Sequence, residues 1–258
     1  MIRIAIANQK GGVGKTTTAI NIATAMAATG WKTLLIDLDP QGNASTGLGI
    51  GATQRELSSY DLLVDQASVD SCAVPSGIPG LDVIPATVDL SGAEVELVGM
   101  SGRAGRLREA LADHRDHDIC FIDCPPSLGL LTLNALTAAD TLMVPLQCEF
   151  FALEGLSQLL QTVEQVQQRF NSELGIIGIV LTMFDRRNRL TDQVAEDVRE
   201  ILGKLVFEAV IPRNVRLSEA PSHGLPALIY DHSCAGSRAY MALARELIAR
   251  LPKERVAA

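Results

Sequence analysis

The chain repeats one pattern, in which a short apolar run is followed by a loop and then by a stretch with helical periodicity. Several apolar runs carry no alternating polar positions, which is typical of strands that are covered on both faces. We predict strands at 2–7, 33–36, 81–84, 119–122, 141–145, 176–181 and 206–211. Helical patterns lie between them, for example at 16–28, 152–170 and 191–202.

Strands that alternate with helices require right-handed crossovers. The pattern therefore predicts an α/β fold, with a mostly parallel, twisted sheet and helices on both faces. We find no internal repeat and no low-complexity linker, and we expect a single domain over residues 1–258. The segment 42–80 is rich in Gly, Ser and Asp, and its hydrophobic pattern is the least regular in the chain. This segment is a candidate for mobility. We expect no N-terminal helix-turn-helix extension, and hence no reading of operator sequence.

Composition narrows the class of protein. A chain of 258 residues with 47% hydrophobic residues can bury a core without disulfides or metal. The net charge of −8 argues against a protein coated with basic surface, such as a nucleic-acid packager, but it allows a local basic patch. No secretory signal or apolar stretch of about 18 residues is present, so we expect a cytoplasmic protein.

The cysteines favour free thiols over a disulfide framework. There are five of them, an odd number, and several lie in or beside apolar runs. Cys120 and Cys124 form the nearest pair, and no second pair stands at a spacing that suits zinc. We therefore expect buried thiols in a reducing compartment and no zinc site.

The first candidate chemistry follows the first apolar run. The sequence there reads Asn8-Gln9-Lys10-Gly11-Gly12-Val13-Gly14-Lys15-Thr16-Thr17. It matches the phosphate-loop pattern at its end, although Gln9 stands at the first glycine position. Glycines let backbone N–H groups surround phosphate oxygens, and the N-terminus of the following helix attracts the same anion.

In such a loop Lys15 reaches the β- and γ-phosphates of a nucleotide, Thr16 offers a hydroxyl to Mg²⁺, and Thr17 offers one to the α-phosphate. The alternative is an ordinary glycine turn between a strand and a helix. We favour the phosphate loop because strand, loop, Lys-Thr pair and helix occur together in order.

A phosphate loop needs an acidic partner for the metal. One apolar run closes in Asp37-Leu38-Asp39-Pro40, and another closes in Asp123. A strand that ends in Asp is typical of a site that holds Mg²⁺, and Asp123 is our candidate. Turn preference alone can also place Asp at a strand end.

These residues resemble the deviant Walker A motif of the ParA/MinD ATPases. Further stretches, over 37–43, 123–127, 145–155 and 211–222, are similar to the short, Soj-type ParA partitioning proteins. The resemblance covers nearly the whole chain. It implies an Mg²⁺-dependent ATPase that closes as a homodimer with ATP sandwiched between two subunits.

The resemblance also implies roles for single residues. Lys10 is the signature lysine that reaches the phosphates of the partner subunit, and Asp39 positions the attacking water near the metal. Glu149 contacts the partner side of the nucleotide, while Pro212 and Asn214 line the adenine pocket. For Asp39 the alternative is a turn-forming residue before Pro40.

Arginines cluster in two late loops, at Arg186, Arg187, Arg189, Arg213 and Arg216. Arg187 and Arg216 align with arginines that contact DNA in the family. Contacts to phosphates predict DNA binding that tolerates any sequence and weakens with salt. The alternative is that these are solvated loop cations.

The function that the resemblance implies is a DNA-partitioning switch at the nucleoid. In it, ATP drives the dimer onto double-stranded DNA and a ParB-type centromere-binding protein stimulates hydrolysis.

A MinD-like membrane-surface switch is an alternative, because a helix near the C-terminus has an apolar face and basic residues elsewhere. The apolar face carries Tyr240, Leu243, Ala244, Leu247, Ile248 and Leu251, and the basic residues are Arg245, Arg250, Lys253 and Arg255. Docking of that helix on its own domain is the ordinary interpretation, and we expect no stable membrane association. A metabolic enzyme on the same loop, such as a nitrogenase-type reductase or a ligase similar to dethiobiotin synthetase, is a further alternative.

Overall fold

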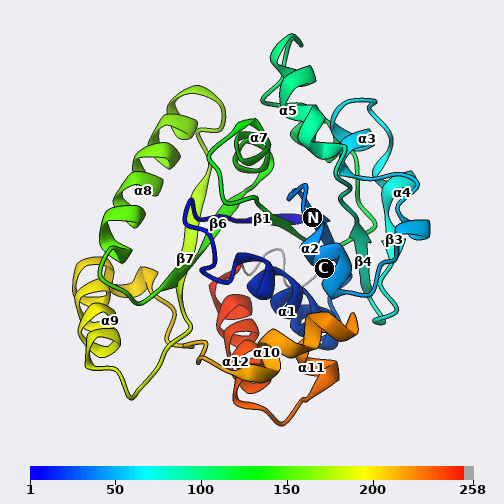
Figure 1. Ribbon diagram of the computed structural model, residues 1–258. Helices are drawn as coiled ribbons and strands as arrows, with labels where there is room; N and C mark the ends of the chain where they lie inside the picture. The colour runs from blue at the N-terminus through cyan, green and yellow to red at the C-terminus, as the bar shows by residue number, and fades with distance from the viewer. Residues whose placement is uncertain (253–258) are drawn as a thin grey trace.

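A single twisted sheet organises the chain (Figure 1). A computed structural model describes residues 1–252. The sheet has seven strands in the order β3-β4-β2-β5-β1-β6-β7. They are β1 (Ile2–Ile6), β2 (Thr33–Asp37), β3 (Val74–Pro75), β4 (Leu81–Ile84), β5 (Ile119–Asp123), β6 (Thr141–Gln147) and β7 (Gly175–Thr182). Neighbouring strands pair in parallel, except that the edge strand β3 is antiparallel to β4. The predicted α/β class and mostly parallel sheet are confirmed.

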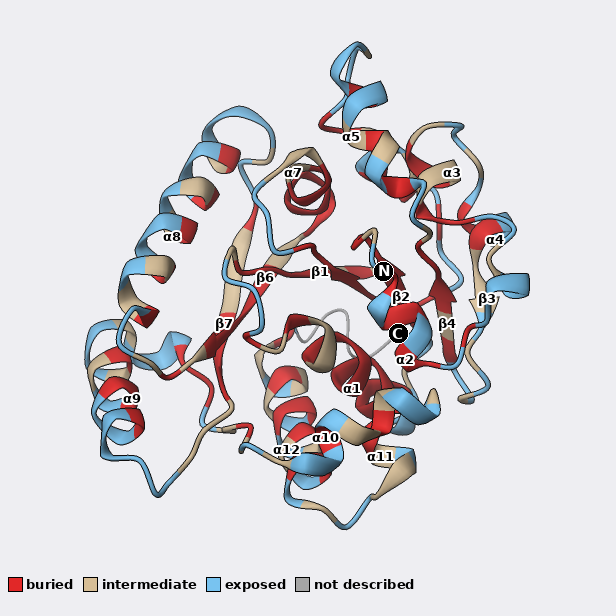
Figure 2. Cartoon of the chain, in the orientation of Figure 1, coloured by how far each residue is buried: buried red, intermediate tan, exposed pale blue. Residues whose placement is uncertain are grey.

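Helices cover both faces of this sheet (Figure 2). The α-helices are α1 (Lys15–Ala28), α2 (Asn43–Gly47), α3 (Ser59–Leu63), α4 (Val69–Cys72), α5 (Leu90–Val98), α6 (Arg106–Ala110), α7 (Leu130–Ala138), α8 (Ala152–Arg169), α9 (Arg189–Leu202), α10 (Val215–Glu219), α11 (Ala227–Tyr230) and α12 (Ala235–Arg250). Within residues 1–252 there are also three short 3₁₀ turns, η1 (Ala52–Gln54), η2 (Gly203–Leu205) and η3 (Ala220–His223). Helices α3 to α9 pack on one face, and α1, α2, α10, α11 and α12 pack on the other.

Side chains of the central strands alternate between two cores. In β1, Ile4 and Ile6 pack with α1 and α12, whereas Ala5 packs toward α7 on the opposite face. Because successive side chains of a strand point to opposite faces, a strand between two helical layers is apolar throughout. This arrangement explains the unbroken apolar runs in the sequence, and it confirms six of the seven predicted strands.

The predicted strand at 206–211 is wrong. The segment lies beside β7, and Phe207 donates its N–H to a carbonyl of that strand. The next two N–H groups, of Glu208 and Ala209, instead donate to the carboxylate of Glu246 on α12, both at 3.0 Å. The side chain from α12 therefore interrupts the ladder, and isolated bridges remain where a strand was expected.

The segment 42–80 forms short elements rather than one long helix or strand. It holds α2, η1, α3, α4 and β3. The start of α3 is fixed by a capping box, in which the Ser58 hydroxyl accepts the N–H of Tyr60 and the Asp61 carboxylate accepts the N–H of Ser58. Elements of two to five residues are too short to produce a periodic pattern, which is why the sequence appeared irregular here.

The C-terminal helix is docked on its own domain. In α12 the side chains of Tyr240, Leu243 and Leu247 are buried in the core that α1 shares. The Tyr240 hydroxyl lies 3.2 Å from the Thr18 hydroxyl of α1. The predicted apolar stripe therefore faces α1, while Lys253 and Arg255 lie outside the described residues. None of the helices within residues 1–252 is long and apolar enough to cross a membrane.

Candidate functional site

The candidate site lies where three neighbouring strands end. In the register of the sheet, Asp123 at the end of β5 is the partner of Ile6 in β1 and of Asp37 in β2. The loop 8–14 leaves β1 at this edge and leads directly into α1. Ligands of open α/β sheets bind outside the carboxyl ends of the strands, so this edge is the expected place for a phosphate site.

The loop has the backbone that the sequence predicts for a phosphate cradle. Gly12 and Gly14 have φ values of 74° and 86°, in the left-handed region where a side chain would cause strain. Gly11 and Gly12 are exposed, whereas Val13 is buried. The Thr182 hydroxyl at the end of β7 donates to the Val13 carbonyl at 2.8 Å, and this bond ties the loop to the far strand.

Lys15 is the first residue of α1 and is only 7% exposed. Its Nζ donates to the carbonyl of Lys10 at 2.9 Å, so the ammonium lies inside the curve of the loop. Burial lowers the pKa of Lys15, and the negative charges of Asp123 and Asp39 oppose that change. Thr16 and Thr17 follow on the first turn of the helix and are half-buried.

Asp123 is the side chain whose surroundings most clearly demand a ligand. It is fully buried, and neither carboxylate oxygen has a hydrogen-bond partner in the structure. Burial raises the pKa of Asp123 well above its usual range, and the nearby charge of Asp37 raises it further. The Thr16 hydroxyl and the Lys15 ammonium act in the opposite direction. A buried carboxylate without partners is costly unless a cation or a proton occupies the site.

Asp37 has a role that the sequence did not reveal. It is fully buried, and its carboxylate accepts the N–H and the hydroxyl of Ser45 at 2.9 and 2.7 Å. It also accepts the N–H of Asp39 at 3.1 Å. Burial raises the pKa of Asp37, and these hydrogen bonds oppose the shift. Asp37 therefore fixes the turn that presents Asp39. The position of Asp37 at the end of a strand indicated that it could be a functional residue. Nothing in the sequence distinguished its role from that of Asp123.

Asp39 lies beside the loop, with 8% of its surface exposed. Its Oδ1 accepts the N–H of Gln41 at 3.0 Å. Its charge acts on both Lys15 and Asp123, which places all three side chains in one electrostatic cluster. The predicted phosphate-loop and carboxylate residues are thus brought together.

The side chain of Lys10 is held by a contact within the chain. Its side chain is 43% exposed and forms an ion pair with Glu149, in the segment between β6 and α8. Its N–H donates to Asn8 Oδ1 at 3.0 Å, and Asn8 Nδ2 donates to the Pro145 carbonyl at 2.8 Å. Asn8 therefore anchors the start of the loop to β6, a role that sequence reasoning missed. Phe150, next to Glu149, is 76% exposed.

The two arginine loops lie side by side. The N–H of Phe184 donates to the Ile211 carbonyl, and the N–H of Arg213 donates to the Phe184 carbonyl, both at 3.0 Å. These bonds place the loop that holds Arg187 beside the segment that leads into α10, and Arg216 lies in the first turn of that helix.

Pro212 and Asn214 belong to the second of these loops. Pro212 bridges to Phe184, and the Asn214 side chain caps α10 by accepting the N–H of Arg216 at 2.9 Å. The side-chain oxygen of Asn214 is thus already used within the protein, and its amide group is the part left to contact a ligand.

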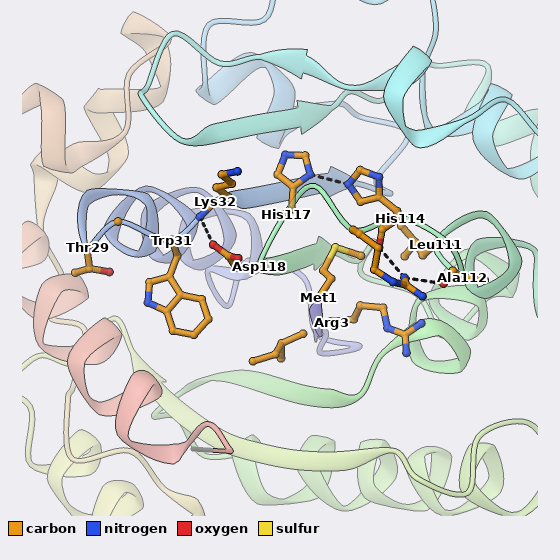
Figure 3. Close-up of a pocket in the computed structure, with 13 residues that line it drawn as sticks. Met1, Arg3, Thr29, Trp31, Lys32, Leu111, Ala112, His114, His117 and Asp118 are labelled. Atoms are coloured by element: carbon orange, nitrogen blue, oxygen red, sulfur yellow. Dashed lines mark hydrogen bonds between the residues drawn. The ribbon is translucent and has the colours of Figure 1, made fainter. Parts of the chain in front are cut away.

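A large cavity lies at the opposite edge of the sheet, near the start of β1 and β5 (Figure 3). It has a volume of about 930 Å³ and is lined by residues such as Trp31, Lys32 and Asp118. In its wall His114 Nε2 lies 2.7 Å from His117 Nδ1. None of the predicted site residues lines this cavity.

Comparisons with known proteins agree with this geometry. The model of a family described as an AAA domain matches residues 1–176. The chain is similar to the chromosome partitioning protein ParA of Caulobacter vibrioides, with 62% identity over 250 residues that cover 96% of this chain and 94% of that protein. It is similar to the sporulation initiation inhibitor protein Soj of Bacillus subtilis, with 53% identity over 247 residues, or 95% of this chain and 98% of that protein.

A solved structure shares the fold. It is the cobyrinic acid a,c-diamide synthase of Mycobacterium smegmatis with bound ADP and magnesium, at 38% identity and a TM-score of 0.83. The match covers 96% of this chain and 94% of that one.

Proposed function

Since this chain belongs to the ParA/MinD family of P-loop ATPases, and to its ParA/Soj branch, we propose that it is the ATP-driven switch of a DNA-partitioning system. In this proposal ATP closes two subunits into a sandwich dimer that binds double-stranded DNA at the nucleoid without sequence preference. A ParB-type centromere-binding protein stimulates hydrolysis, and hydrolysis releases the DNA. The relatives named as chromosome partitioning proteins support this function.

The main observation in support of ATPase chemistry is the buried carboxylate of Asp123, which has no hydrogen-bond partner and lies beside the buried Lys15. Carboxylate and hydroxyl oxygens are ligands that Mg²⁺ prefers, so Asp123 and Thr16 fit an Mg²⁺·ATP complex, with Asp39 close by. When bound, Mg²⁺ neutralises charge on the phosphate oxygens. The N–H groups of residues 11–17 and the Lys15 ammonium hold the phosphates in place.

Hydrolysis requires a positioned water and a further positive charge. Asp39, fixed by Asp37, orients the water for attack on the terminal phosphate. Lys10 reaches the phosphates of the partner subunit, where it acts like an arginine finger and stabilises charge only in the closed dimer. In the single subunit Lys10 pairs with Glu149, so closure exchanges this partner for phosphate. Glu149 then contacts the partner side of the nucleotide, and Pro212 and Asn214 line the adenine pocket.

The DNA contact is assigned to Arg187 and Arg216. Both side chains are exposed, Arg187 on the loop before α9 and Arg216 in the first turn of α10, and a dimer presents two copies of each. Contacts of this kind neutralise phosphates and release counterions. With about four phosphates neutralised per dimer, the logarithm of the affinity falls with the logarithm of the salt concentration at a slope of roughly −4.

Two alternatives have less support. A MinD-like membrane switch would need a free amphipathic helix, but the apolar side of α12 is packed against α1. A reductase would need cysteines at a surface that two subunits share, but Cys120 and Cys124 are buried in the core. The solved relative with a synthase activity is 38% identical, whereas the two partitioning relatives reach 62% and 53%.

Co-sedimentation tests the proposal. The protein is incubated with plasmid DNA or with liposomes, in the presence of ATP, ADP or no nucleotide. We expect sedimentation with DNA in ATP alone. Sedimentation with liposomes in place of DNA would support the membrane switch. DNA binding that is equal with ATP, with ADP and without nucleotide would contradict the proposed ATP-driven switch.

A further inference from the structure

Both arginines assigned to the DNA contact are already paired with carboxylates. Arg187 makes two side-chain hydrogen bonds to Asp185, at 2.9 and 2.8 Å. Arg216 donates to Glu219 at 2.8 Å, and its Nε lies 3.6 Å from Asp231. Three carboxylates therefore stand within reach of two arginines.

The carboxylates share one arrangement relative to the arginines. The Arg187 side chain is 87% exposed, whereas that of Asp185 is 25% exposed. Arg216 is 51% exposed, against 40% for Glu219 and 29% for Asp231. In each pair the arginine side chain is more exposed than its carboxylate partner. A ligand that approaches from solvent meets the guanidinium first.

Asp185 and Asp231 keep their negative charge to lower pH than an ordinary carboxylate, because the pKa of each is lowered. The hydrogen bonds from Arg187 lower the pKa of Asp185 to about 2. The pKa of Asp231 is also lowered, chiefly by a hydrogen bond from Ser233. Negative charge therefore remains at the surface where DNA phosphates would lie.

Resting on the proposed DNA surface, we propose that Asp185, Glu219 and Asp231 limit the affinity of this protein for DNA. A phosphate offers a guanidinium the same two-oxygen partner that a carboxylate offers. DNA binding is then an exchange, in which each arginine leaves its carboxylate for a phosphate. The carboxylate that stays behind repels the DNA.

This exchange keeps the contact weak and reversible. Exposed ion pairs contribute little to stability, so the arginines leave their carboxylates easily. Each remaining carboxylate opposes binding by Coulomb repulsion. A single subunit then holds DNA poorly, and tight binding needs the paired loops of two subunits. Release after hydrolysis is correspondingly fast.

Two conservative substitutions test the proposal. Asp185→Asn removes the charge but keeps the oxygen that accepts the Arg187 N–H, a bond of 3.1 Å. Glu219→Gln likewise removes the charge beside Arg216, at the last residue of α10, and keeps a side-chain oxygen. Asp231 is left unchanged because it also accepts the N–H groups of Ser233 and Cys234. Binding of each full-length variant to a mixed-sequence DNA duplex is measured by fluorescence anisotropy with ATP and Mg²⁺, and thermal melting confirms that each variant is folded.

We expect each substitution to strengthen DNA binding about threefold at low salt, with the gain shrinking as salt screens the repulsion. Asp113→Asn is the matched control. It makes the same charge change at an exposed position before β5, at the opposite edge of the sheet. The control should leave affinity unchanged, which separates local repulsion from net charge.

The outcomes separate this inference from the proposed function. If the wild-type protein fails to bind DNA in any nucleotide state, the proposed DNA surface is wrong. If the wild type binds and both variants bind equally well or more weakly, the carboxylates do not limit affinity and the inference is overturned. A gain that Asp113→Asn reproduces would overturn it as well.

Discussion

Replacing Asp123 by Asn should stabilise the nucleotide-free protein while removing its response to Mg²⁺·ATP. In the folded chain this carboxylate is buried without hydrogen-bond partners, and its pKa is raised by burial and by the charge of Asp37. The charged form therefore opposes folding. An amide has the same shape and carries no charge.

The size of the effect follows from the cost of a buried polar group. Leaving such a group unpaired costs about 1–3 kcal/mol and more when it is charged, and the amide removes only the excess that the charge adds. The lost attraction to Lys15 offsets part of the gain, so we expect a net stabilisation of about 2 kcal/mol. For a chain of this length that corresponds to a rise in Tm of about 4–8 °C.

The pH dependence gives the sign of the effect. Because the folded state holds the proton of Asp123 more tightly than the unfolded chain, wild-type stability falls as pH rises from the ordinary carboxylate range through the raised pKa. The Asn variant lacks this loss. Its advantage should therefore be full at high pH and vanish at low pH, where the wild-type carboxyl group is protonated in both states.

Differential scanning fluorimetry across this pH range, with and without Mg²⁺·ATP, measures both effects. Ligand binding raises the Tm of the wild type, and this rise should be absent in the Asn variant. The exposed control Asp113→Asn should change neither. A variant that melts below the wild type at high pH, or that keeps the full Mg²⁺·ATP response, would refute the assignment of Asp123.

Three further predictions concern the other site residues. Lys15→Gln should abolish tight binding of ATP·Mg²⁺ in calorimetry, and unchanged affinity would exclude the loop as the phosphate site. Asp39→Ala should bind ATP and accumulate as a dimer in size-exclusion chromatography, and normal phosphate release by this variant would remove Asp39 from catalysis. The double variant Arg187→Ala, Arg216→Ala should lose plasmid binding yet still dimerise with ATP, and retained DNA binding would place the DNA surface elsewhere.

The sequence predicted the elements that are long and apolar. Six strands and three long helices appear within a few residues of their predicted bounds, because burial between two helical layers leaves a clear pattern. The segment 206–211 misled the prediction, since its apolar residues are buried beside β7 but its N–H groups bond to Glu246. A side chain from a distant helix leaves no mark on the local pattern.

The residues of the candidate site were predictable where they belong to a continuous sequence motif with a single chemical role. The glycines and Lys15 followed from the phosphate-loop pattern, and the structure brings them beside Asp123. The roles of Asn8 and Asp37 were not predictable. They depend on hydrogen bonds to Pro145 and Ser45, which the fold brings close and the local sequence does not.

One of the three carboxylates beside the arginines could not be placed from the sequence, whereas Asp185 and Glu219 stand within three residues of their arginines. Asp231 stands far along the chain from Arg216, and contact between them depends on how α11 returns to α10. Charge counted along the sequence showed clustered arginines, whereas the structure shows arginines that are already paired.

The central claim is that Lys10 completes the active site of the partner subunit. It is tested most directly by mixing two inactive variants, Lys10→Ala and Asp39→Ala, and measuring ATP hydrolysis. In a mixed dimer, the site on the Lys10→Ala subunit keeps its own Asp39 and receives Lys10 from its partner. We expect mixing to restore about a quarter of the wild-type rate, because half of randomly paired dimers carry one intact site. A mixture that forms dimers yet stays inactive would contradict the account, because Lys10 would then act within its own subunit.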